Sequence, residues 1–140
     1  MYKVCIVTGA SRGLGRGIAK VLAEERSATV YATARSEAAL NDLASSIKGN
    51  TGVIHPVVLD QSDDSAVEKF ITTVAEKEGR IDLLVNSAYG GFTAMTPHFG
   101  KPFWERPISV FDASIDIGLR SASVSYTHLR AHETIEDRVF

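Results

Sequence analysis

Three glycines near the N-terminus, Gly9, Gly13 and Gly15, have the spacing of a turn that binds phosphate. They follow an apolar run at 4–7 and precede a stretch with helical periodicity at about 14–25. The first glycine permits a sharp turn, the second a close approach of backbone to a diphosphate, and the third tight packing of helix on strand. The helix N-terminus would add free N–H groups and a partial positive charge. The sequence therefore predicts a dinucleotide-binding unit, and a glycine-rich turn without a ligand is the alternative.

Two arginines indicate which dinucleotide binds. Sites for NAD place a carboxylate about 20 residues after the glycine turn, where it binds the ribose 2′-hydroxyl. This sequence has Arg35 at that point, and Arg12 lies within the glycine turn. Guanidinium groups bind phosphate through paired hydrogen bonds, so the pattern predicts NADP, with NAD the less favoured cofactor. Arg16 would add to the positive field, and a solvated arginine at a helix start is the alternative for Arg35.

Strands and helices alternate along the chain up to residue 85. We expect further strands at 28–33, 53–59 and 81–85, rich in β-branched and apolar residues. Helices are expected between them, one capped by Ser36 and one opening at 62–65. Pro56 lacks a backbone N–H, which favours an edge position for the third strand. The alternation predicts an α/β fold with a Rossmann-type doubly wound parallel sheet.

Polar residues follow the third and fourth strands, at the sheet edge where ligands of such folds bind. Asp60 and Gln61 close the third strand, and the loop NSAYGG at 86–91 follows the fourth. The Asn86 amide is expected to join neighbouring strand ends. The pattern TGxxxGxG at 8–15 together with NSAY at 86–89 resembles the short-chain dehydrogenase/reductase family, although Ser87 and Tyr89 depart from the NNAG of that family.

The resemblance implies that residues 1–122 are the NADP-binding half of an oxidoreductase domain, with the sheet truncated after about four strands in the order 3-2-1-4. It implies carbonyl reductase or alcohol dehydrogenase activity on a small-molecule carbonyl or alcohol substrate. The full-length protein would be a homo-oligomer. An aspartate at the position of Asp60 contacts adenine in the family, and a turn-forming aspartate is the alternative. The residues expected to bind the cofactor are Gly9, Ser11, Arg12, Gly13, Leu14, Gly15, Arg35, Asp60, Gln61, Asn86 and Ala88.

The catalytic residues of the family are not found in this sequence. The resemblance calls for a serine on a fifth strand and a Tyr-x-x-x-Lys on the next helix, and neither is present. Tyr126 has an arginine, Arg130, at the lysine position. Asp116 stands at the position of the family's helix asparagine, where a charged group replaces an amide. We therefore expect the chain of 140 residues to be inactive by itself. A non-catalytic NADP-binding module is the alternative function.

The C-terminal residues read differently from the rest. VSYTHLRAHET at 124–134 resembles a translated sequencing adapter, so 123–140 is expected to be a non-native or disordered tail. A natural, divergent C-terminus is the alternative. The charged residues of 123–140 leave no apolar face by which a helix there could pack. His128 and His132 have the spacing of a metal-binding pair on a helix, but no third ligand accompanies them, so no metal site is expected.

The composition is that of a soluble domain or part of one. With 140 residues and a net charge of −2, the chain gives no reason to expect a nucleic-acid partner. No apolar run reaches the roughly 18 residues of a membrane span. The sequence starts with a strand rather than a leader, so a cytoplasmic protein is expected, with membrane association of the full-length protein left open. Cys5 is interpreted as a core residue.

The stretch 91–107 is expected to be a long loop. It carries four aromatic residues, Phe92, Phe99, Phe103 and Trp104. A position near the substrate pocket and simple packing of aromatics are the two interpretations. After it, the residues 109–112 are expected to start a helix, with Ser109 as its cap.

Overall fold

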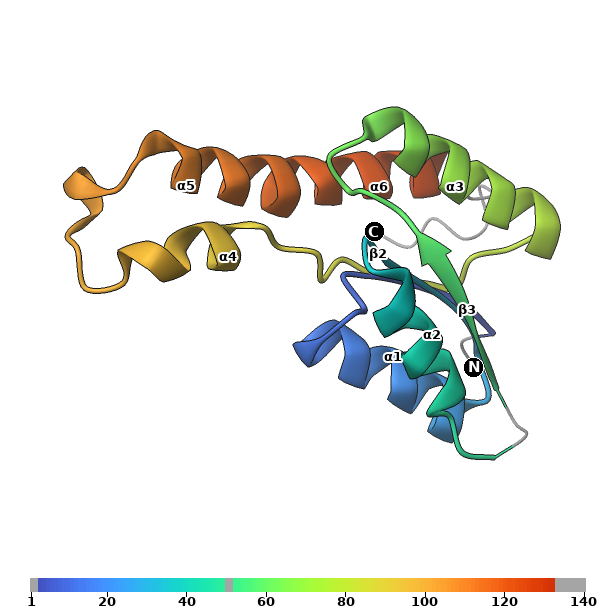
Figure 1. Ribbon diagram of the computed structural model, residues 1–140. Coiled ribbons are helices and arrows are strands. Elements are labelled where there is room, and N and C mark those ends of the chain that lie inside the picture. The colour runs from blue at the N-terminus through green and yellow to red at the C-terminus, as the bar shows by residue number, and fades with distance from the viewer. Residues whose placement is uncertain (1–2, 50–51, 133–140) are drawn as a thin grey trace.

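Four parallel strands form one sheet in the computed structural model, which describes residues 3–49 and 52–132 (Figure 1). The order is β3-β2-β1-β4, and the strands are β1 (Val4–Thr8), β2 (Thr29–Ala34), β3 (Val53–Val58) and β4 (Leu83–Val85). β1 is fully buried because it lies between β2 and β4, with Val7 beside both Ala32 and Val85. Pro56 lies on β3, an edge of the described sheet, as predicted. The α/β fold class and the strand order 3-2-1-4 are confirmed.

Helices cover both faces of this sheet. Figure 1 shows α1 (Gly13–Arg26) and α2 (Glu37–Ser45) on one face, with α3 (Asp64–Glu78) and α6 (Ser121–Ala131) on the other. Side chains of a strand alternate between the faces, so β1 contributes to two cores. Cys5 and Val7 pack on the side of α1 and α2, whereas Ile6 packs with Val67 and Ile71 of α3.

The helix caps expected from the sequence are present. The Ser36 hydroxyl accepts a hydrogen bond from the Ala39 amide at 3.3 Å, and α2 begins at the next residue. Within the predicted opening at 62–65, Asp63 is the cap of α3 and accepts from the Ala66 amide at 3.0 Å. Each bond satisfies one of the amides that a helix leaves free at its N-terminus.

After β4 the chain forms an arm that projects from the sheet (Figure 1). It comprises α4 (Gly91–Met95), the 3-10 turns η1 (Thr96–His98) and η2 (Phe103–Glu105), and α5 (Ile108–Ser114). The predicted long loop thus has helical structure. α5 starts directly after Pro107, and Ser109 does not cap it, which corrects the expected helix start. Proline suits this place because its φ is fixed and it has no N–H to satisfy.

α5 continues into a π-helical segment, η3 (Ile115–Arg120), and then into α6, so one long helix runs through 108–131. This corrects the disorder expected from residue 123 onward, as far as residue 132. The buried residues of α6, Ser121 and Ser125, are small, and Val124 packs in the core of α3. The sequence pattern missed this because the buried stripe of α6 is made of small polar side chains. Residues 133–140 lie outside the described residues, and a non-native origin of the tail stays a prediction.

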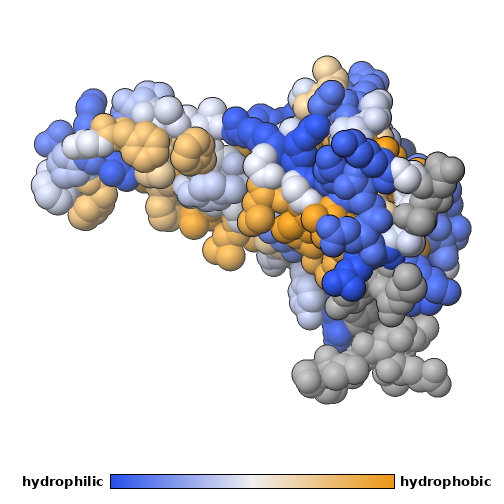
Figure 2. All heavy atoms as spheres, turned by 90° about the horizontal axis from the view of Figure 1, so that it is seen from below, coloured by the Kyte–Doolittle hydropathy of each residue, from blue (hydrophilic) through white to orange (hydrophobic). Residues whose placement is uncertain are grey.

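Apolar side chains gather on the surface of the arm. Figure 2 shows this apolar surface, and the exposed residues there include Phe92, Phe99, Phe103, Trp104, Ile108 and Phe111. Two aromatic pairs meet edge to face, Phe92 with Phe99 and Phe103 with Trp104. Their exposure shows that packing within the described residues does not account for them. Among the described helices, none combines the length and apolar character needed to cross a membrane.

Candidate functional site

The glycine turn packs against the loop that follows β4. Gly9 has φ +67°, and a Cβ placed on it would lie 2.7 Å from the Ala88 Cα. A Cβ on Gly15 would lie 2.5 Å from the Gly9 carbonyl oxygen. Gly13, at φ +58°, has open space around the same position. The turn therefore has the three features predicted for it: a sharp bend, an exposed backbone in the middle and a close contact with helix α1.

Thr8 joins the two strand ends at this edge of the sheet. Its hydroxyl oxygen accepts hydrogen bonds from the Ser87 amide at 3.1 Å and the Ala88 amide at 3.2 Å. This is the role expected of Asn86, which is instead exposed. Thr8, buried at the end of β1, already accepts from the two amides of this loop. The threonine before the glycine turn was the signal in the sequence.

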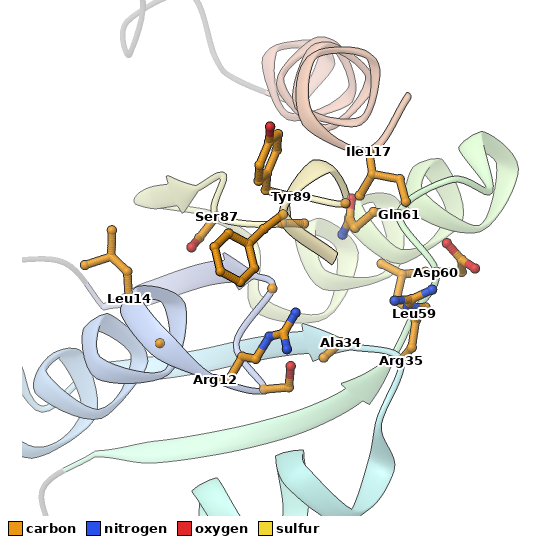
Figure 3. A pocket seen from close by; sticks show the side chains of 16 residues that line it. Arg12, Leu14, Ala34, Arg35, Leu59, Asp60, Gln61, Ser87, Tyr89 and Ile117 are labelled. Carbon is orange, nitrogen blue, oxygen red and sulfur yellow. The ribbon is translucent and has the colours of Figure 1, made fainter. Parts of the chain in front are cut away.

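A pocket of about 480 Å³ opens at the carboxyl ends of the strands (Figure 3). Nine of the eleven predicted residues line it, namely Gly9, Ser11, Arg12, Gly13, Leu14, Arg35, Asp60, Gln61 and Ala88. Gly15 lies behind the turn, and Asn86 and Asp116 are not in the lining. The sequence reasoning did not place Leu59, Tyr89, Phe92 or Ile117 in this wall. Apolar lining residues carry no sequence signal that separates them from core residues.

The two arginines of the NADP prediction both line the pocket. Figure 3 shows the Arg12 guanidinium pointing into it and Arg35 beside Asp60. Arg12 also donates to the Thr93 hydroxyl of α4 at 3.1 Å. Arg16, by contrast, donates to Asp42 at 2.7 Å and to the Ala39 carbonyl at 3.2 Å. The Arg16 guanidinium is thus paired with α2. The prediction that Arg16 adds to the positive field of the cofactor site is wrong.

Asp60 is held in a local turn. One carboxylate oxygen, Oδ1, accepts from the Ser62 amide at 2.9 Å and from the Ser62 hydroxyl at 2.7 Å. These two bonds, followed by the nearby charge of Arg35, lower the pKa of Asp60. The carboxylate is therefore ionised at neutral pH and balances part of the Arg35 charge. This geometry is that of the turn-forming aspartate named as the alternative.

Gln61 carries an acceptor without a partner. Its amide nitrogen donates to the Thr33 hydroxyl at 3.2 Å, whereas its carbonyl oxygen, also buried, has no hydrogen-bond partner among the described residues. A buried acceptor left unpaired costs free energy, and a donor from a ligand in the pocket would satisfy it. The glycine turn, the two guanidinium groups and this acceptor fit a nucleotide with phosphate groups.

Within residues 3–49 and 52–132, no three histidine, cysteine, aspartate or glutamate side chains gather as a metal site requires. The two histidines of the tail contact α3. His128 Nδ1 lies 3.8 Å from the Glu68 carboxylate, and His132 Nε2 lies 3.2 Å from the Thr72 hydroxyl. Both side chains thus help to seat α6 on α3.

The family of the chain follows from a comparison with known proteins. The family model described as short chain dehydrogenase matches residues 3–130. The chain belongs to the short-chain dehydrogenase family. It is 44% identical over 119 residues to dehydrogenase/reductase SDR family member 1 of Mus musculus, and equally to that of Homo sapiens. These matches cover 84% of this chain and 38% of each relative, so the chain spans well under half of their length.

Solved structures of short-chain dehydrogenases superpose on the fold. A metagenomic short-chain oxidoreductase in complex with NADP has a TM-score of 0.80 and 32% identity, with 93% of this chain and 56% of that chain covered. An alcohol dehydrogenase from Thermococcus sibiricus, complexed with 5-hydroxy-NADP, has a TM-score of 0.77 and 26% identity over 93% and 52% of the two chains. A 3-ketoacyl-(acyl-carrier-protein) reductase from Brucella melitensis, complexed with NADH, scores 0.76 at 27% identity over 93% and 49%. These relatives support a nicotinamide cofactor for this short-chain dehydrogenase chain.

Proposed function

We propose that the chain is the NADP-binding half of an oxidoreductase that moves hydride between nicotinamide and a ketone or alcohol. The observation that carries the choice of NADP is the position of Arg35. It lines the pocket at the end of β2, where a site for NAD has a carboxylate, and Arg12 lines the same pocket from the glycine turn. Two guanidinium groups supply the paired donors that a 2′-phosphate requires.

The lining suggests where each part of the cofactor binds. The exposed backbone of Gly13 and the N-terminus of α1 would hold the diphosphate. Leu59, Ala88 and Ile117 offer apolar surface for the adenine ring, and Gln61 lies beside them. The nicotinamide of the bound cofactor supplies or receives the hydride. The residues of this chain would bind and orient the adenosine and diphosphate part of the cofactor. Residues 1–122 form this half in our proposal.

We further propose that the 140 residues bind NADPH without turning over a substrate. The family's serine and Tyr-x-x-x-Lys are absent from the sequence, and these groups move the proton on the substrate oxygen. Asp116 is exposed and outside the lining, which does not support a catalytic role for it. NADPH oxidation by the purified protein in the presence of ketones, above a heat-inactivated control, would contradict this part of the proposal.

Isothermal titration calorimetry with NADPH and NADH tests the cofactor. We expect NADPH to bind more tightly, and Arg35→Ala to weaken NADPH binding by about 10- to 100-fold with little change for NADH, because charge-assisted hydrogen bonds contribute about 1.5–3 kcal/mol. Arg26→Ala, which removes an arginine in the last turn of α1, is the matched control. Equal affinities for the two cofactors in the unmodified protein would refute the NADP assignment.

Sequencing the gene distinguishes the two proposals, the half of an enzyme and the non-catalytic module. A reading frame that continues beyond residue 122 into a serine-bearing strand and a Tyr-x-x-x-Lys helix supports the enzyme. A gene that encodes residues 123–140 as printed supports a module that binds NADP without catalysis.

A further inference from the structure

We propose that Tyr89 is a positioning residue that holds the long helix 108–131 over the pocket, so that Ile117 forms a wall against the adenine ring. The inference rests on the proposed function, because the ring it concerns belongs to the cofactor. Tyr89 stands where the family motif NNAG has a glycine. It is a residue of this chain that the family pattern does not explain.

The Tyr89 side chain fits a notch in the long helix and in the start of α4. A Cβ placed on Gly118 would lie 3.1 Å from the ring carbon Cδ2, and one on Gly91 would lie 2.3 Å from the phenolic oxygen. Two glycines thus leave the space that the ring and its hydroxyl occupy. In Figure 3 the hydroxyl points toward the long helix rather than into the pocket.

A hydrogen-bond chain fixes the hydroxyl. The phenolic oxygen lies 3.2 Å from the Ser114 hydroxyl, which in turn donates to the Val110 carbonyl oxygen at 2.9 Å. Ser114 is the last residue of α5 and directly precedes the π-helical segment. Tyr89 therefore contacts the helix on both sides of Ile117, at Ser114 and at Gly118.

Ile117 packs on the loop after β4, at Gly90, the residue that follows Tyr89. A Cβ on Gly90 would lie 2.8 Å from Ile117 Cδ1, so the isoleucine side chain rests on the Gly90 backbone. Ile117, Tyr89 and Gly90 all line the pocket. π-Helical turns are frequent at functional sites. Here the π-helical segment carries Ile117, which lines the pocket together with Leu59.

Titration calorimetry on the whole chain, with three probes, tests the inference. The probes are NADPH, adenosine 2′,5′-bisphosphate and inorganic pyrophosphate. We expect Tyr89→Ala to weaken the two adenine-containing probes by about tenfold and to leave pyrophosphate unchanged, because an Ile117 wall formed only a tenth of the time reduces affinity in that proportion. Tyr89→Phe keeps the ring but loses the hydrogen bond to Ser114, so it is expected to weaken the two adenine-containing probes less than Tyr89→Ala does. Tyr126→Ala is the matched control, because Tyr126 is similarly exposed on α6 and outside the pocket.

A double-mutant cycle with Gly118 separates positioning from general damage. Gly118→Ala alone is expected to weaken NADPH binding, because its methyl group displaces the ring of Tyr89. In the Tyr89→Ala background the same change is expected to cost nothing. Equal losses in both backgrounds, or a parallel loss of pyrophosphate binding, would overturn the inference. If Tyr89→Ala fails to fold, Gly118→Ala decides instead, since NADPH binding by Gly118→Ala as tight as that of the unmodified protein would also overturn the inference. Failure of the unmodified protein to bind NADPH would instead refute the proposed function.

Discussion

Replacing Gly9 by alanine should destabilise the fold much more than the same change at Gly13. Both residues have positive φ, +67° and +58°, so each alanine loses about 1–2 kcal/mol through the left-handed conformation. At Gly9 the added methyl group would also lie 2.7–2.8 Å from backbone atoms of Ser87 and Ala88. Backbone cannot change rotamer, so overpacking adds about 1–3 kcal/mol. We expect a total loss of about 2–5 kcal/mol for Gly9→Ala and about 1–2 kcal/mol for Gly13→Ala.

Urea unfolding followed by circular dichroism measures the two free energies. With a slope of about 2 kcal/mol per molar, the midpoint of Gly9→Ala should lie about 0.5–1.5 M below that of Gly13→Ala. Gly13→Ala should weaken NADPH binding although it costs little stability, because the added methyl group would lie where the backbone approaches the diphosphate. A Gly9→Ala protein as stable as Gly13→Ala would refute the close packing of the turn on the loop after β4.

Three further outcomes follow from the hydrogen bonds and burial described above. Thr8→Val should lose about 2–4 kcal/mol of unfolding free energy, because the Ser87 and Ala88 amides lose their acceptor, whereas Thr8→Ser should retain most of it; urea unfolding compares them. Partial burial acts to raise the pKa of Asp82, but hydrogen bonds from a guanidinium and two backbone amides outweigh it and lower that pKa. The stability it gives is present above pH 4 and lost as pH falls through its native value, so Asp82→Asn should be less stable at pH 7 and show a flatter acid titration. Burial, and then the charge of Asp82, raises the pKa of Cys5 to about 11, so a disulfide reagent at pH 8 should react only as the protein unfolds, and fast labelling of the native protein would contradict its burial.

Local patterns were sufficient to predict the first two thirds of the fold. The apolar run before Gly9, the cap at Ser36 and the proline in β3 each act through their own backbone or nearest neighbours. Such signals do not depend on which element lies opposite. For the same reason, nine of the eleven predicted binding residues line the pocket, since they lie in the segments directly after strand ends that a parallel sheet brings together.

Contacts between distant elements could not be predicted in the same way. The direction of the Arg16 side chain depends on Asp42 of α2. The strand ends are joined by the hydroxyl of Thr8 rather than by the expected Asn86, and this depends on how the loop after β4 meets β1. The helix through 108–131 was missed beyond residue 122 because Ser125 is buried without being apolar. Packing against α3 fixes the position of α6, and the periodicity of apolar residues in the sequence does not reveal this contact.

The central place of β1 in the sheet has a consequence for how the protein is made. β1 is synthesised before the other three described strands, yet Asp82, which binds the Val4 amide, lies 78 residues after Val4, and Ala88, which packs on the glycine turn, lies 80 residues after Thr8. A nascent chain that has finished α3 still carries β1 with one side unpaired and a turn without support. The ability to hold a nucleotide should therefore arise late and in a single step, when the loop after β4 reaches the turn, rather than grow with each added strand.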